Sequence, residues 1–202
     1  MTMNRSRQRA PLPGDEALAS ARFHDHQLQC EVVKIMPGEL FVASGRIALA
    51  TVLGSCVSAC IWDPVTRIGG MNHFMLAEGR VESGNSESMR YGRFAMDTLI
   101  EHVVAAGALR HCLQAKVFGG GQVLRQRLSQ NDIGGDNARF VLDYLEEQGI
   151  EVVAQDLGDV CPRKLYFFPD TGRVLLRRLP TDASEVVLRE EQAYRQRIVH
   201  EA

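Results

Sequence analysis

The sequence predicts one mixed α/β domain in which largely antiparallel strands form layers with helices. Two observations predict it. Short apolar runs, broken by glycine and proline, fill much of residues 31–76 and 150–179, which is typical of paired strands. Two longer segments between these regions place apolar residues at helical spacing. Strands interleaved with helices over about one domain length favour a single layered α/β sandwich.

The first half of the chain is predicted to be rich in strands. The expected strands cover residues 31–36, 40–43, 47–52, 56–62 and 68–76. The breaks between them are Pro37-Gly38, Ser44-Gly45, Gly54 and Asp63-Pro64. A polar loop rich in glycine and serine then covers 78–87.

Helices and strands alternate in the second half. Tyr91, Ala95, Leu99 and Val103 recur at helical spacing before Gly107 ends the segment. A strand at 115–118 precedes a second helix at 137–148, for which Asp136 is the expected N-cap. Further strands are predicted at 150–156, 164–168 and 173–179, the last two joined by a hairpin turn.

The two ends of the chain differ from this domain in pattern. Residues 1–20 are polar, basic and without period, so we expect a disordered tail. The domain is predicted to cover 21–182. A C-terminal tail at 183–202 carries Val187, Tyr194 and Ile198 near one helical face and is a candidate terminal helix.

Composition excludes several classes of function. The net charge of −2 comes from interspersed charges, which gives no electrostatic footprint for nucleic acid. No stretch approaches the roughly 20 apolar residues of a membrane helix, and no signal peptide is predicted, so we expect a cytoplasmic protein without membrane insertion. Five scattered cysteines fit neither a disulfide framework nor a zinc site, and we expect Cys60 to be a buried apolar residue.

Cys56 and His73 are the candidate reactive pair. Cys56 follows Gly54-Ser55 between two apolar runs, and His73 lies in a third run. An imidazole can activate a thiol, and backbone N–H groups at a sharp Gly-Ser turn can form an oxyanion hole. Thr51 is a candidate third residue. In the alternative interpretation, Cys56 and His73 are both packed core residues.

Several ordered motifs resemble those of the CheD family of chemoreceptor glutamine deamidases. The resemblance covers roughly residues 31–180. The matching motifs are Leu53-Gly54-Ser55-Cys56-Val57, Asn72-His73-Phe74-Met75-Leu76, Tyr91-Gly92 with Ala95-Met96, Lys116-Val117-Phe118-Gly119-Gly120, Ile133-Gly134 with Asn137, and Arg163-Lys164 followed by Thr171-Gly172-Arg173.

The resemblance implies a fold similar to that of bacterial deamidating toxins and an amidohydrolase with a cysteine nucleophile. Cys56 and His73 match the family nucleophile and histidine. Some members place the family threonine six residues before the cysteine, at Ala50, and Thr51 is the nearest threonine here. Gly54, Ser55 and Asn72 are expected to position the substrate and its oxyanion. No metal or cofactor is implied.

The implied partners are the cytoplasmic helices of methyl-accepting chemotaxis receptors and, in some bacteria, a CheC-type phosphatase. Phe118, Gly119 and Gly120 are the candidate partner surface. The alternative function is a non-catalytic adaptor that binds receptors or the phosphatase. A cysteine peptidase or transglutaminase-like enzyme would share the thioester step and differ in its leaving group or acceptor.

Overall fold

The structure, a computed structural model, describes residues 18–75, 87–122 and 132–180 and, near the C-terminus, residues 187, 189, 191–194 and 196. Almost all of the predicted N-terminal tail and of the loop at 78–87 therefore lies outside the described residues. Leu18 forms a bridge with Leu40, and Ala19 is buried, so these two residues, which precede residue 21, contact the domain.

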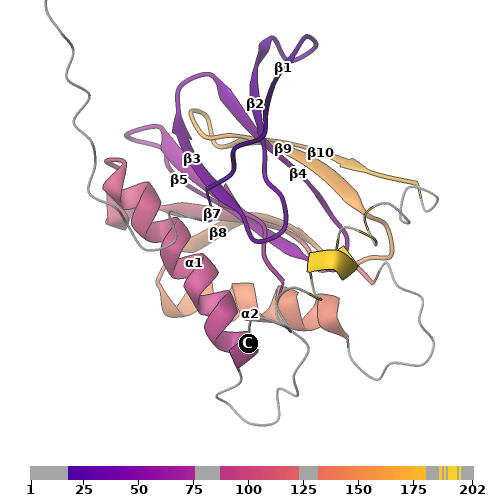
Figure 1. The fold of residues 1–202 in the computed structure, drawn as a ribbon. Helices are drawn as coiled ribbons and strands as arrows, with labels where there is room; N and C mark the ends of the chain where they lie inside the picture. The colour runs from indigo at the N-terminus through magenta and orange to yellow at the C-terminus, as the bar shows by residue number, and fades with distance from the viewer. Residues whose placement is uncertain are drawn as a thin grey trace, which may run out of the picture.

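Two five-stranded sheets form the framework (Figure 1). The first sheet has the order β1-β2-β4-β9-β10, from Arg22–Asp25, Cys30–Lys34, Ile47–Leu53, Arg163–Phe168 and Arg173–Arg178. The second has the order β3-β6-β5-β7-β8, from Leu40–Ser44, Ile68–Asn72, Val57–Asp63, Gln114–Gly119 and Glu151–Leu157. Most pairings are antiparallel; β2–β4 and β7–β8 are parallel.

The second sheet is the middle layer of the molecule. Helices α1 (Glu87–Ala105) and α2 (Ile133–Glu147) pack on one face of it, and the first sheet packs on the other. A short 3₁₀ helix, Arg110–Cys112, precedes β7. Figure 1 shows both helices on the same side of the strands. The predicted mixed, layered α/β architecture is confirmed.

The sequence of strand β5 explains why this strand lies in the middle layer. Its apolar side chains alternate between the helices and the first sheet, as the pleat of a strand requires. Val57, Ala59 and Ile61 join the core under the helices, while Cys60 and Trp62 join the core between the sheets. A strand covered on both faces reads as a nearly continuous apolar run, and residues 56–62 show one that is interrupted only by Ser58. Cys60 is fully buried, as predicted, and burial raises the pKa of its thiol.

Two predicted boundaries differ most from the structure. Strand β6 ends at Asn72 rather than continuing to residue 76, although Phe74 still bridges to Val57. Helix α2 begins at Ile133, and its N-cap is Asp132, whose carboxylate accepts a hydrogen bond from the N–H of Gly135. Asp136 lies in the first turn instead of at the cap. Among the described residues, no helix is long and apolar enough to cross a membrane.

Candidate active site at the crossing between the sheets

Cys56 lies where the chain crosses from one sheet to the other. Strand β4 of the first sheet ends at Leu53, and β5 of the second begins at Val57. Gly54, Ser55 and Cys56 form the crossing, and all three are buried. Val57 and Phe74 exchange two backbone hydrogen bonds of 2.9 Å, which place His73 beside this crossing.

Thr51 and His73 are in direct contact. The Thr51 Oγ1 atom lies 2.9 Å from His73 Nδ1, and the same hydroxyl donates a 2.8 Å hydrogen bond to the Ile35 carbonyl. A hydroxyl has one proton to donate, so toward His73 it is the acceptor and Nδ1 carries the ring proton. The tautomer derived from these contacts leaves the lone pair of the neutral imidazole on Nε2.

The pleat of β4 decides which residue meets His73. Thr51 faces the space between the sheets together with Leu49 and Leu53, whereas Ala50 belongs to the small cluster on the outer face of the first sheet. Successive strand residues point to opposite faces, so a side chain at position 50 could not reach the imidazole. The threonine five residues before Cys56 therefore makes the contact.

The environment of His73 keeps its imidazole neutral. Burial lowers the pKa of His73 from its ordinary value of 6.5 to about 4, although the nearby Glu191 carboxylate acts in the opposite direction. His73 Nε2 is buried and has no hydrogen-bond partner among the described residues. An unprotonated, unpartnered nitrogen close to a thiol is available to take up a proton.

Glu191 completes the site, and the sequence interpretation missed it. Its carboxylate accepts hydrogen bonds from the backbone N–H groups of Gly54 (2.9 Å), Ser55 (3.1 Å) and Cys56 (3.0 Å). The Ser55 hydroxyl donates a fourth, of 2.7 Å. The available signal was its spacing: Glu191 is four residues after Val187 and three before Tyr194, on the apolar face of the C-terminal tail.

Cys56, His73 and Glu191 are residue types that can bind a metal ion. The Cys56 sulfur, a ring nitrogen of His73 and a carboxylate oxygen of Glu191 lie within 4.8 Å of one another. However, three backbone N–H groups and one hydroxyl already converge on the carboxylate, and N–H dipoles attract anions and repel cations. The geometry therefore favours an anion site, and we assign no metal to it.

Residues of helix α2 and of the segment after β7 donate hydrogen bonds to the carbonyl groups of the crossing. The buried Asn137 side chain donates a 2.8 Å hydrogen bond to the Ser55 carbonyl, which orients the following peptide and its Cys56 N–H. Gly120 N–H donates to the Cys56 carbonyl at 2.8 Å, and Gly121 N–H donates to the Gly54 carbonyl at 2.7 Å. The bonds to the Gly54 and Ser55 carbonyls thus orient the peptides that carry the Ser55 and Cys56 N–H groups, and the bond to the Cys56 carbonyl holds the end of the crossing.

Two groups of predicted residues lie differently from expectation. Asn72 accepts from Ala59 N–H and donates to the Ala95 carbonyl, so its amide ties the second sheet to α1 and supplies no donor at the Glu191 carboxylate. Phe118, Gly119 and Gly120 are buried against the Cys56 crossing. Buried residues cannot present a partner surface in this conformation. These three residues pack against the Cys56 crossing instead.

Two kinds of similarity relate this chain to known proteins. Residues 75–178 match the family model described as CheD chemotactic sensory transduction, which is about half of the chain. A relative from Thiobacillus denitrificans is 50% identical over 186 residues, which cover 91% of this chain and 92% of the relative. The chain belongs to the CheD family.

Other CheD relatives are similar over most of their length. The match in Methylobacillus flagellatus is 48% identical over 189 residues, covering 92% of this chain and 93% of the relative. The match in Bordetella petrii is 54% identical over 165 residues, covering 81% and 74%. All three relatives carry the name "Probable chemoreceptor glutamine deamidase CheD". The match to the family model begins at residue 75 of this chain, so it does not cover Cys56 or His73.

Proposed function

We propose that this chain is a protein-glutamine deamidase that hydrolyses glutamine side chains of chemotaxis receptors to glutamate, releasing ammonia. The observation that carries the proposal is the convergence of the Thr51–His73 pair, the Cys56 thiol and the three N–H groups of residues 54–56. The names of its CheD relatives supply the substrate class. Receptor helices in the cytoplasm are the partners that this function requires.

The proposed reaction begins with a proton transfer from the Cys56 thiol to His73 Nε2. The thiolate then attacks the carboxamide carbon, and the carbonyl oxygen becomes an oxyanion held by the backbone N–H groups of Gly54, Ser55 and Cys56. The C–N bond breaks as His73 returns the proton to the nitrogen, and ammonia leaves. A thioester on Cys56 remains.

Water completes the cycle in a second acyl transfer. His73 accepts a proton from the water as its oxygen attacks the thioester carbon. The C–S bond breaks, the thiol is reprotonated, and glutamate is released. Thr51 keeps the ring proton on Nδ1 throughout, so that Nε2 faces the reacting atoms in both steps.

The test is mass spectrometry of a chemoreceptor cytoplasmic fragment incubated with wild type, Cys56→Ala and Cys60→Ala. We expect the mass increase of a glutamine-to-glutamate change with wild type and Cys60→Ala, and none with Cys56→Ala. Cys60 is the matched control because it is buried in the same core, four residues away. Activity that survives in Cys56→Ala would overturn the role of Cys56.

The same experiment separates the other classes of function. Peptide fragments would indicate a peptidase, and crosslinked products a transglutaminase-like enzyme. Binding of the fragment without any mass change would indicate the adaptor. Phe118, Gly119 and Gly120 are buried, so an adaptor would need another surface to bind a CheC-type phosphatase.

A further inference from the structure

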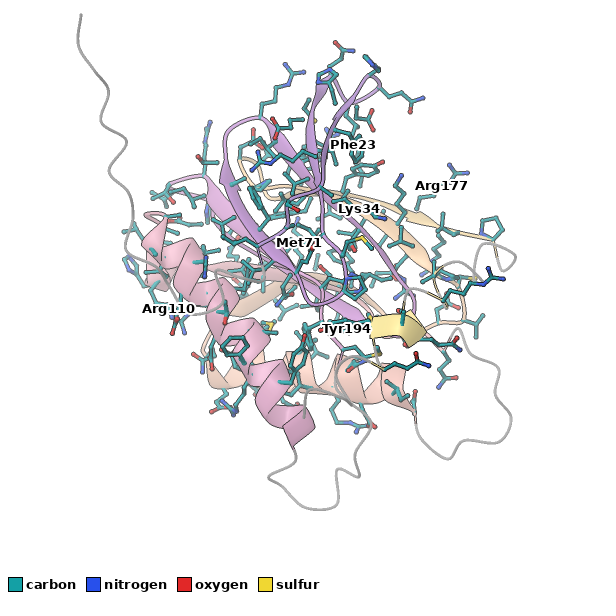
Figure 2. The ribbon with its side chains drawn as sticks, in the orientation of Figure 1. Phe23, Lys34, Met71, Arg110, Arg177 and Tyr194 are labelled. Atoms are coloured by element: carbon teal, nitrogen blue, oxygen red, sulfur yellow. The ribbon has the colours of Figure 1, made fainter. Side chains whose placement is uncertain are left out.

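The C-terminal segment, defined by the helical residues 187, 189, 191–194 and 196, covers the candidate active site. Val187, Glu191 and Tyr194 are its buried residues, whereas Arg189, Gln192, Ala193 and Gln196 are exposed. Figure 1 shows the segment (yellow) beside the end of β4, and Figure 2 shows the labelled Tyr194 on it. One face of a short helix is therefore packed onto the protein, with a carboxylate at its centre.

Tyr194 anchors the segment in the core between the sheets. Its ring belongs to the core between the sheets and lies 6.4 Å, between ring centroids, from the ring of Tyr91 on α1. It also packs on Gly38, where an added Cβ would lie 2.7 Å from the tyrosine ring. Gly38 N–H donates to the His73 carbonyl, so Tyr194 packs next to the His73 segment while Glu191 binds the Cys56 crossing.

The Glu191 side chain carries the same functional group as the product of the proposed reaction. A glutamate side chain is what deamidation of glutamine generates, and here a glutamate carboxylate accepts bonds from the three N–H groups assigned to the oxyanion. One set of donors cannot hold two anions at once. With the segment in place Cys56 is also fully buried, so a substrate glutamine cannot reach the thiol.

We propose that the C-terminal segment is an intramolecular, product-like inhibitor, in which Glu191 occupies the carboxamide position of the site and must withdraw before a substrate binds. This inference rests on the proposed deamidase function for its consequence in catalysis. Its structural part, the closing of the Cys56 site by Glu191, can be measured separately. Substrate would bind only the molecules in which the segment is withdrawn. The apparent affinity for substrate is therefore reduced in proportion to the fraction of molecules that are open.

The first measurement is the rate at which iodoacetamide alkylates each cysteine, followed by mass spectrometry, in wild type, Glu191→Ala and Arg189→Ala. The chain supplies its own references, because Cys112 and Cys161 are partly exposed whereas Cys30 and Cys60 are buried. We expect Glu191→Ala to raise the alkylation rate of Cys56 at least about tenfold, since losing even one charge-assisted hydrogen bond shifts an opening equilibrium by that factor. Arg189→Ala, exposed on the same segment, should leave the rate unchanged.

Protection of Cys60 from alkylation shows that the core of a variant is still folded. If Glu191→Ala also exposes Cys60, the comparison is made with Glu191→Gln, which keeps the volume of the side chain and removes its charge. Unchanged Cys56 alkylation in a variant that still protects Cys60 would overturn the proposal. Faster Cys56 alkylation with Cys60 protected supports it.

The second measurement is deamidation of a chemoreceptor cytoplasmic fragment by the same variants, which should rise with the alkylation rate in Glu191→Ala. If wild type and Glu191→Ala deamidate the fragment at equal rates, the inhibitory role is overturned while the proposed function stands. If alkylation rises but neither variant deamidates the fragment, the proposed function fails and Glu191 remains the cover of the thiol.

Discussion

The hydroxyl of Thr51 determines what His73 can do. Its single proton is donated to the Ile35 carbonyl, which forces His73 Nδ1 to be the donor in the remaining contact. The basic nitrogen, Nε2, is thereby directed away from Thr51. A third residue of this kind acts by holding the imidazole in one tautomer and orientation, without touching the substrate.

Replacing Thr51 tests this positioning role. Thr51→Val keeps the shape of the side chain but leaves the buried Nδ1–H and the Ile35 carbonyl without their partner. Leaving a buried polar group unpaired costs about 1–3 kcal/mol, so we expect kcat for deamidation to fall about 5- to 150-fold. Thr51→Ser retains the oxygen and should retain most of the activity. Equal losses in both variants would contradict the hydrogen-bonding role.

The pKa of His73 predicts how stability depends on pH. His73 is a base whose pKa is about 4 in the folded protein and 6.5 ordinarily, so between these values the unfolded chain binds more protons. Stability therefore rises with pH across this window and is lost as the pH falls from 6.5 toward 4. The loss is on the order of 3 kcal/mol.

Urea unfolding at several pH values checks this dependence. The control is His73→Asn, which cannot titrate, and we expect it to lose less stability than wild type over the same pH range. Parallel curves for the two proteins would show that another group is responsible.

At the scale of elements, the end of β7 and the start of α2 hold the Cys56 crossing in shape. Gly119 and Gly120 have positive φ angles of 112° and 63°, which let the chain turn closely beneath Cys56. Gly134 in α2 packs against the Gly120 carbonyl, where an added Cβ would lie 2.5 Å away. Arg163, buried at the start of β9, donates to the Gly119 carbonyl from the other side.

Gly119→Ala tests this support. A Cβ at residue 119 would overlap the carbonyl oxygen of Cys56, so we expect a lower midpoint of thermal unfolding and loss of deamidation. The matched control is Gly45→Ala, which also has a positive φ, of 76°, but no atom within 4 Å of an added Cβ. If the two variants lose the same stability, backbone strain alone explains the effect and close packing does not.

At the scale of the whole molecule, the site depends on how the two sheets pack. Thr51 belongs to the first sheet, whereas His73 follows a strand of the second, so their hydrogen bond crosses the interface. The core between the sheets, which includes Leu49, Met71 and Phe167, sets the distance between the sheets that this hydrogen bond must span. Phe167 packs edge-on to Trp62, with ring centroids 6.3 Å apart.

Phe167→Ala should weaken both the fold and the site. Truncating a buried phenylalanine costs about 3–5 kcal/mol, and the cavity would lie between the two sheets, beside Leu49 and Trp62. We expect reduced resistance to urea, with a change in the fluorescence of Trp62, the single tryptophan. Phe94→Ala, in which the ring is 46% exposed, is the control and should cost far less. Comparable losses in the two variants would contradict the importance of the interface between the sheets.

The sequence alone located most elements of this fold, although not β1, and it proposed Cys56 and His73 as a reactive pair. Local periodicity locates strands and helices because the pleat and the helical turn impose it on neighbouring residues. The motifs around Cys56 and His73 were recognisable for a similar reason: each is short and contiguous. These signals depend on residues close together in the chain, so they are readable without knowing which segments meet.

Tertiary structure decided everything that depends on distant segments meeting. Glu191 bonds to residues 135 to 137 positions earlier, and no local pattern specifies such a contact. The direction of the pleat selected Thr51 over Ala50, and layer packing turned Asn72 toward α1 and buried Phe118. In each case the deciding factor is which face of an element the packed layers cover, because that fixes which polar groups must find partners inside the protein.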